Sequence, residues 1–150
     1  MIIENEIKLD YKDVLIRPKR SNLESRSDVD LSRNYTFKHS KYNWSNNTVP
    51  IMISNMDTTG TFTMAIEVMK LGVFTCIHKH YTLSEWIEFS KNKDLLDNWY
   101  NYVAISSGSR NNDIEKLKTI INIIPTIKFI CLDVANGYCE SFVKTVKQCR

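Results

Sequence analysis

Four short apolar runs, separated by segments of helical periodicity, constrain the fold of this chain more than any other feature. The runs are VPIMIS (49–54), VFTCI (73–77), YVAIS (102–106) and IKFICLD (127–133). Each is apolar at successive positions, as is typical of strands buried on both faces in a parallel sheet. The alternation of strand and helix predicts an α/β fold in which four βα units place their strands side by side, parallel and in sequence order, with covering helices.

The segments between these runs carry the signals of helix starts and stops. The predicted helices span residues 62–71, 82–91, 113–124 and 141–149. Thr82 and Glu85 have the spacing of a capping box, in which each side chain bonds the other residue's backbone N–H. Asn112 is expected to cap the third helix, while Gly72 and Pro125 are expected to end the first and the third.

A polar cluster follows each predicted strand directly. The clusters are Ser54–Asp57, His78–His80, Ser106–Ser109 and Asp133–Gly137. In parallel α/β folds, ligands bind at the carboxyl ends of the strands, in barrels as well as in open sheets. Four clusters at one edge therefore indicate one shared site, and Lys79, in the second cluster, is expected to belong to it.

The second cluster places Lys79 between two histidines and allows three interpretations. His78 and His80 share one face of an extended chain, so they are a possible metal pair, but a zinc site needs further ligands and no spacing supplies one nearby. We therefore expect no metal. By itself Lys79 also fits a solvated strand end, and Asp133 fits a simple cap of the next turn. If both belong to a site, Lys79 should point toward the mouth of the sheet near Asp133, with both histidines on the packing side.

Chain length decides between an open sheet and a barrel. Neither a GxGxxG turn nor a Walker A lysine loop is present, so the usual phosphate-binding loops of open sheets are missing. A (β/α)8 TIM barrel needs eight units and about 250 residues. Residues 1–48 precede the repeat and are predicted to form an N-terminal arm, while 49–150 would form the first half of a barrel in one apparently truncated domain. Half a barrel leaves unpaired strand edges, so something else should complete it.

Charge and cysteine content exclude several functional classes. The net charge of +3 is mild and spread along the chain, which argues against a nucleic-acid partner. No apolar run reaches membrane-spanning length, and the N-terminus is too charged for a signal peptide. The four cysteines show no CxxC spacing, and Cys76 and Cys131 lie inside apolar runs. This pattern predicts reduced thiols in a cytoplasmic protein without disulfides.

Several motifs together resemble those of the GMP reductases, in the IMP dehydrogenase/GMP reductase family. They are LDYKDVLIRPKRSNLESRSDVDL (9–31), FKHS (37–40), NMDTTGTF (55–62), FTCIHKHY (74–81), VAISSGS (103–109) and KFICLDVANGY (128–138). The match is nearly collinear over the whole chain. The combination of NMDT, HKHY and DVANGY favours the reductase over the dehydrogenase. The segment KYNWSNNTVP is slightly longer than usual, which affects a surface turn only.

The resemblance implies a (β/α)8 barrel that reduces GMP to IMP with NADPH and releases ammonia, in a homotetramer. It also implies a nucleophilic cysteine in a Gly-rich Ser-x-Cys-x-Thr loop beside a potassium ion. No such loop occurs in these 150 residues, so none of the four cysteines inherits the role. Alternatively, the chain is a non-catalytic truncated form or subunit that binds nucleotide or pairs with other chains.

Roles for individual residues follow from the same resemblance. Lys79 and Asp133 match the lysine and aspartate near the departing amine and the nicotinamide, and would serve both catalysis and cofactor binding. A lysine near a carboxylate can relay the proton that ammonia needs to leave. Val134 and Ala135 would line the cofactor side.

Three further positions match ligand-binding residues of the family. Ser25 and Arg26 correspond to the pair that meets the adenosine end of NADPH, where a guanidinium suits a phosphate. Met56 corresponds to the residue that lies against the purine of the substrate, GMP or IMP.

Overall fold

The computed structural model describes residues 3–40 and 42–150, apart from the side chains of residues 43 and 45–47. The chain divides into two compact units, an N-terminal unit that ends at Asp30 and a larger unit, Leu31–Arg150.

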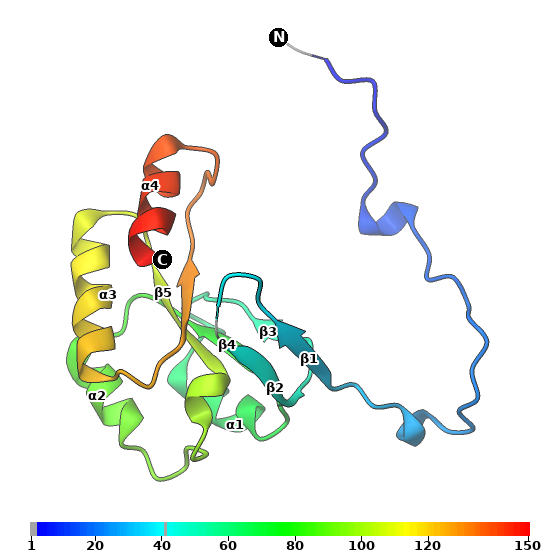
Figure 1. Ribbon diagram of the computed structural model, residues 1–150, viewed down its shortest axis with the longest axis horizontal. Coiled ribbons are helices and arrows are strands. Elements are labelled where there is room, and N and C mark those ends of the chain that lie inside the picture. The colour runs from blue at the N-terminus through cyan, green and yellow to red at the C-terminus, as the bar shows by residue number, and fades with distance from the viewer. Residues whose placement is uncertain (1–2, 41) are drawn as a thin grey trace. The chain divides into compact units, whose positions relative to one another are not determined.

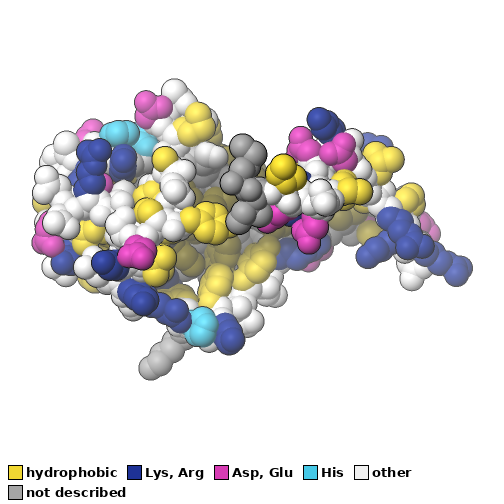
Figure 2. Space-filling model, turned by 90° about the horizontal axis from the view of Figure 1, so that it is seen from above, with side chains coloured by type: hydrophobic (Ala, Val, Ile, Leu, Met, Phe, Trp, Pro, Cys, Tyr) yellow, Lys and Arg dark blue, Asp and Glu magenta, His cyan; other side chains and the backbone are white. Residues whose placement is uncertain are grey.

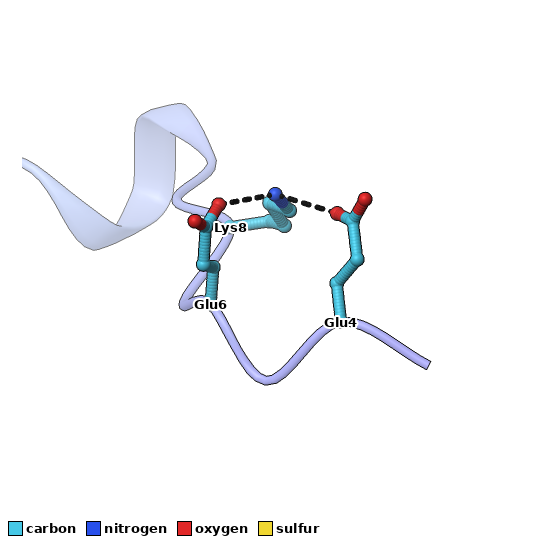
Figure 3. A network of polar contacts seen from close by, with 3 residues as sticks. All are labelled: Glu4, Glu6 and Lys8. Carbon is cyan, nitrogen blue, oxygen red and sulfur yellow. Dashed lines mark hydrogen bonds and ion pairs between the residues drawn. The ribbon is translucent and has the colours of Figure 1, made fainter. Parts of the chain in front are cut away.

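Local polar contacts define the N-terminal unit, since all of its described residues are exposed. Two short 3-10 turns, η1 (Tyr11–Asp13) and η2 (Arg26–Asp28), are each closed by a capping box. Ahead of them, the Lys8 ammonium lies 2.9 Å from a Glu4 carboxylate oxygen and 3.0 Å from a Glu6 oxygen (Figure 3). These carboxylates raise the pKa of Lys8 above its usual value. Because every described residue of this unit is exposed, the described part has no core of its own, and ion pairs this exposed are strongly screened by solvent.

The larger unit is built on a parallel sheet with the order β3-β4-β5-β6 (Figure 1). Its strands are β3 (Met52–Ile53), β4 (Phe74–Ile77), β5 (Val103–Ser107) and β6 (Phe129–Leu132). The prediction of four parallel strands in sequence order is thereby confirmed. β3 is shorter than the apolar run 49–54, because the Val49 N–H donates to the Gly72 carbonyl and the Ile51 N–H to Val49, outside the ladder.

Four helices follow the strands: α1 (Phe62–Met69), α2 (Leu83–Ser90), α3 (Asn111–Ile123) and α4 (Glu140–Cys149). The Thr82–Glu85 capping box is present at α2. The expected Asn112 cap is wrong: the Arg110 carbonyl already accepts the Ile114 N–H at 3.1 Å, so α3 begins at Asn111. Among the described residues, no helix combines the length and apolar character needed to cross a bilayer.

Strand alternation divides the apolar side chains between two faces of the sheet. On the helix-covered face, Ile77 and Val103 pack with Met69, Trp86 and Ile120 in one cluster that α1, α2 and α3 share. Each of these five is at most 1% exposed. Because one core includes three helices and two central strands, these helices cover the same side of the sheet (Figure 1).

The opposite face carries a smaller cluster of Phe74, Cys76 and Ala104, against which Phe129 and Cys131 pack. Hydrophobic side chains also reach the surface between charged ones of both signs (Figure 2). At the β3 edge, Ile51 and Met52 are 54% and 58% exposed. The sheet therefore ends at an open apolar edge.

An antiparallel hairpin of β1 (Arg33–Thr36) and β2 (Asn43–Thr48) precedes the sheet and belongs to the larger unit. The Trp44 ring lies 5.0 Å from Phe74 and 5.6 Å from Phe129, the first residues of β4 and β6. Its Nε1 donates to the Asn101 carbonyl, just before β5, at 3.0 Å. Trp44 thus packs at the N-terminal ends of the strands. Sequence patterns placed residues 31–48 in the arm, whereas tertiary contacts join them to the sheet.

Candidate functional site

The carboxyl ends of β4, β5 and β6 bring their polar segments to one cleft. The cleft has a volume of about 570 Å³ and is lined by Lys79, Gly108, Ser109, Arg110, Asp113, Asp133, Val134 and Ala135. Four residues that the family resemblance singled out, Lys79, Asp133, Val134 and Ala135, therefore lie together. They come from segments more than fifty positions apart in the chain.

Lys79 lies at the rim of this cleft, next to the β5–α3 loop. Its Nζ is 3.6 Å from the point that a Cβ on Gly108 would occupy. Lys116 of α3 donates from its Nζ to the Lys79 carbonyl at 2.8 Å, which holds the backbone of this turn. Lys79 also lines a small cavity on the helix side with Trp86. The lysine side chain therefore stands between the cleft and the helical layer.

Asp113, in the first turn of α3, lies close to Lys79, and sequence patterns did not indicate this proximity. Its Oδ2 contacts the same point at which a Gly108 Cβ would stand. Position 108 therefore admits the carboxylate beside Lys79 because it carries no side chain. Periodicity predicted Asp113 only as the first residue of a helix. The one sequence signal for a place in the site was its position a few residues after Gly108, the glycine at the end of a strand.

The Asp133 side chain is hydrogen-bonded by a residue that follows the strand at the opposite edge of the sheet. Asn55, which follows β3, donates from Nδ2 to Asp133 Oδ2 at 3.0 Å. The Asp133 backbone N–H donates to the Ser107 carbonyl at 3.1 Å. Within residues 3–40 and 42–150, no ion pair joins Asp133 to Lys79, although both line the cleft. Asn55 belongs to the Ser54–Asp57 cluster that was expected at this edge, but no individual role was predicted for it.

Three other ligand-binding residues were predicted from the family resemblance. Met56 is 58% exposed in the β3–α1 loop and is absent from the cleft lining. Ser25 and Arg26 lie in the N-terminal unit, where the Ser25 hydroxyl accepts the Ser27 N–H at 3.2 Å as the cap of η2. The structure describes Ser25 and Arg26 within that unit alone, so their predicted cofactor role stays a prediction.

The two histidines beside Lys79 have different environments. His78 is only 8% exposed, and its ring stacks on Tyr81 at 4.2 Å, which itself stacks on Phe62 at 3.8 Å. Burial lowers the pKa of His78. The expected packing role is confirmed for His78 but is wrong for His80, which is exposed because a turn at 79–80 ends the strand alternation. No group of three metal-binding side chains occurs among the described residues.

All four cysteines are free thiols. Cys76 of β4 and Cys131 of β6 pack together on the sheet face opposite the helices, and a hydrogen bond between their thiols holds the pKa of Cys131 down to about 6 while raising that of Cys76. The two residues lie on strands separated by β5. Two strand spacings amount to about 9–10 Å, beyond the Cα separation of about 7 Å that a disulfide spans. The two thiols therefore interact, but their strands are too far apart for a disulfide bond.

Sequence comparison supplies relatives for nearly the whole chain. Residues 8–150 match the model of the IMP dehydrogenase / GMP reductase domain. Human GMP reductase 2 is 52% identical over 149 residues, and GMP reductase 1 of Rattus norvegicus is 51% identical over 148. A GMP reductase of Phytophthora infestans is 53% identical over 149 residues. The alignments cover 99% of this chain but 40–41% of each relative, so the chain spans about two fifths of their length.

Structural comparison agrees with the fold. A crystal structure of inosine 5′-monophosphate dehydrogenase from Legionella pneumophila superposes with a TM-score of 0.67 at 27% sequence identity. The superposition covers 91% of this chain and 38% of that one. The four-stranded parallel sheet with its helices thus corresponds to part of a TIM barrel.

Proposed function

Since the chain belongs to the IMP dehydrogenase/GMP reductase family, we propose that the full-length protein containing it is an NADPH-dependent GMP reductase. In this reaction GMP takes up a hydride and a proton and yields IMP and ammonia. The observation that carries the proposal is the shared cleft of Lys79, Asp133, Val134 and Ala135 at the carboxyl edge of the sheet. The relatives' name and the motif combination NMDT, HKHY and DVANGY support the reductase over the dehydrogenase.

The residues around the cleft suit the chemistry of a departing amine. Ammonia leaves readily only when its nitrogen is protonated, and the Lys79 ammonium at the rim can donate that proton. Asp133 and Asp113 line the same cleft and provide carboxylates that can accept or relay protons. Val134 and Ala135 contribute apolar side chains to the cleft lining, and apolar side chains suit contact with a flat ring. NADPH, when bound, supplies the hydride.

The remaining parts of the proposal rest on the family resemblance. Ser25 and Arg26 would bind the adenosine end of NADPH, and Met56 would lie against the purine. The nucleophilic cysteine and the potassium ion would lie in a loop outside these 150 residues. A homotetramer is proposed on the same basis, and a cytoplasmic location on the cysteine pattern.

The first experiment uses the full-length product of the gene. Loss of NADPH absorbance is followed with GMP, and IMP and ammonia are quantified; the opposing assay supplies IMP and NAD⁺. Lys79→Ala should lower kcat about 10²–10⁴-fold, the typical contribution of general-acid help, with little change in the KM for GMP. Lys118→Ala is the matched control, because Lys118 is an exposed lysine paired with Glu115 at 2.8 Å outside the cleft. Normal turnover of Lys79→Ala would contradict the assigned role.

A non-catalytic role for the 150-residue chain by itself is the second candidate. The open β3 edge, with Ile51 and Met52 more than half exposed, favours pairing with further polypeptide. We expect no NADPH oxidation by this chain alone, since it has no Ser-x-Cys-x-Thr loop. Turnover by the isolated chain would overturn this expectation.

A further inference from the structure

We propose that Asn55 is a positioning residue for Asp133, holding one carboxylate oxygen so that the other is presented to the cleft. The inference rests on the proposed function for its catalytic meaning. Its structural basis is the hydrogen bond from Asn55 Nδ2 to Asp133 Oδ2 at 3.0 Å, which joins residues 78 positions apart. Asn55 follows β3 and Asp133 follows β6, so the bond joins the ends of the two outermost strands of the sheet.

Chemistry fixes the direction of this contact. An ionised carboxylate only accepts hydrogen bonds, so the amide must turn its NH₂ group toward Asp133. Among the described residues, Asn55 is the only side chain that bonds the Asp133 carboxylate. Oδ1 is therefore left for the cleft that Asp133 lines. Hydrogen bonds to a charged acceptor are also stronger than neutral ones, which makes this contact an effective anchor.

The backbone under Asn55 is held by a tight loop. Gly60 packs so closely that a Cβ there would lie 2.9 Å from Asn55 Cα and 2.7 Å from the Ser54 carbonyl oxygen. Thr59 Oγ1 donates to the same Ser54 oxygen at 3.2 Å, and the His78 N–H donates to the Gly60 carbonyl at 2.8 Å. The loop is thus tied both to the end of β3 and to the segment that carries Lys79. The backbone that carries the Asn55 amide is therefore held in place and the residue is half-buried, as a positioning residue requires.

Two substitutions in the full-length protein test the inference. Asn55→Ala frees the Asp133 carboxylate and should lower kcat about 10–100-fold, the range expected when a reacting group is misplaced, with the KM for GMP within about twofold. Asn55→Asp places a second carboxylate within hydrogen-bonding distance of Asp133. Two such groups share one proton and titrate as a pair. The acidic limb of the kcat/KM profile should then move upward by about one pH unit or more.

Thr59→Val is the matched control. It removes a bond of the same loop but leaves the Asn55 amide in place, so kcat and the acidic limb should change much less than in the Asn55 variants. If Thr59→Val reproduces both effects of the Asn55 variants, general loop damage explains them and the inference is wrong. An unshifted acidic limb in Asn55→Asp would also overturn it.

A crystal structure of Asn55→Ala separates this inference from the proposed function. If the parent protein fails to oxidise NADPH with GMP, the proposed function fails, and the Asp133 conformer then decides the positioning role. We expect the carboxylate to leave its original position in the variant. An unchanged Asp133 side chain would show that Asn55 does not hold it.

Discussion

Replacing Gly60 with alanine should destabilise the protein through a purely steric conflict with backbone atoms. The new Cβ would contact the Cys76 carbonyl oxygen and lie 2.7 Å from the Ser54 oxygen and 2.9 Å from Asn55 Cα. No rotation of a side chain can relieve these contacts, because all three atoms belong to the backbone. The ends of β3 and β4 must therefore move apart to admit one methyl group.

The size of the effect follows from the contacts involved. Overpacking by an added methylene or methyl typically costs about 1–3 kcal/mol, and the upper end applies where backbone must shift. The displacement also stretches the bond from the His78 N–H to the Gly60 carbonyl, worth about 1 kcal/mol when lost. We therefore expect the free energy of unfolding to fall by about 3 kcal/mol.

Denaturant unfolding followed by tryptophan fluorescence measures this change, since Trp86 and Trp99 are buried in the larger unit. Gly137→Ala is the control. There a Cβ would lie 3.7 Å from the Phe142 ring, an ordinary contact, so stability should stay unchanged or rise slightly. A Gly60→Ala protein within about 0.5 kcal/mol of the parent would refute the steric reasoning.

Three further outcomes follow from the environments of buried and polar groups. Burial lowers the pKa of His78 below its usual value near 6.5, so the unfolded chain binds that proton more tightly than the folded one. The contribution of His78 to stability should therefore be complete above about pH 6.5 and be lost as the pH falls below it. In urea unfolding across this range, the loss of stability should be smaller in His78→Phe than in the exposed control His39→Phe. The contact with Cys76 holds the pKa of Cys131 at about 6, so in Cys76→Ala the pH midpoint of Cys131 alkylation by iodoacetamide, read by mass spectrometry, should rise. An unchanged midpoint would contradict the thiol contact. Trp86→Ala should cost about 3–5 kcal/mol of unfolding free energy, since the ring is 1% exposed; a loss below about 1 kcal/mol would contradict its place in the core.

Local and periodic information in the sequence was sufficient for the framework of the larger unit. Short runs with apolar side chains on both faces, alternating with helical segments, are typical of buried parallel strands, so the four parallel strands could be predicted from the sequence. The Thr82–Glu85 capping box was equally predictable, because both bonds lie within one helical turn. The order of the strands also followed, since each βα unit places the next strand beside the last.

Sequence patterns also indicated the edge of the sheet at which the candidate site lies, but not the contacts within it. Polar clusters after each strand pointed to the carboxyl ends, where Lys79 and Asp133 do line one cleft. That Asp133 bonds Asn55 rather than an ammonium, and that Asp113 stands over Gly108, could not be predicted. These contacts depend on loop paths and side-chain rotamers that no periodicity encodes.

The role of Trp44 illustrates the same division. Within residues 31–48 nothing repeats, so the sequence offered no reason to separate this segment from the arm. Only the tertiary structure brings its indole against Phe74 and Phe129 and its Nε1 to the Asn101 carbonyl. Strand and helix arise from bonds among near neighbours and from the alternation of apolar side chains, both of which a sequence displays. Contacts between residues tens of positions apart arise only when the packed chain selects one register and one loop path, and that selection is made by the whole fold.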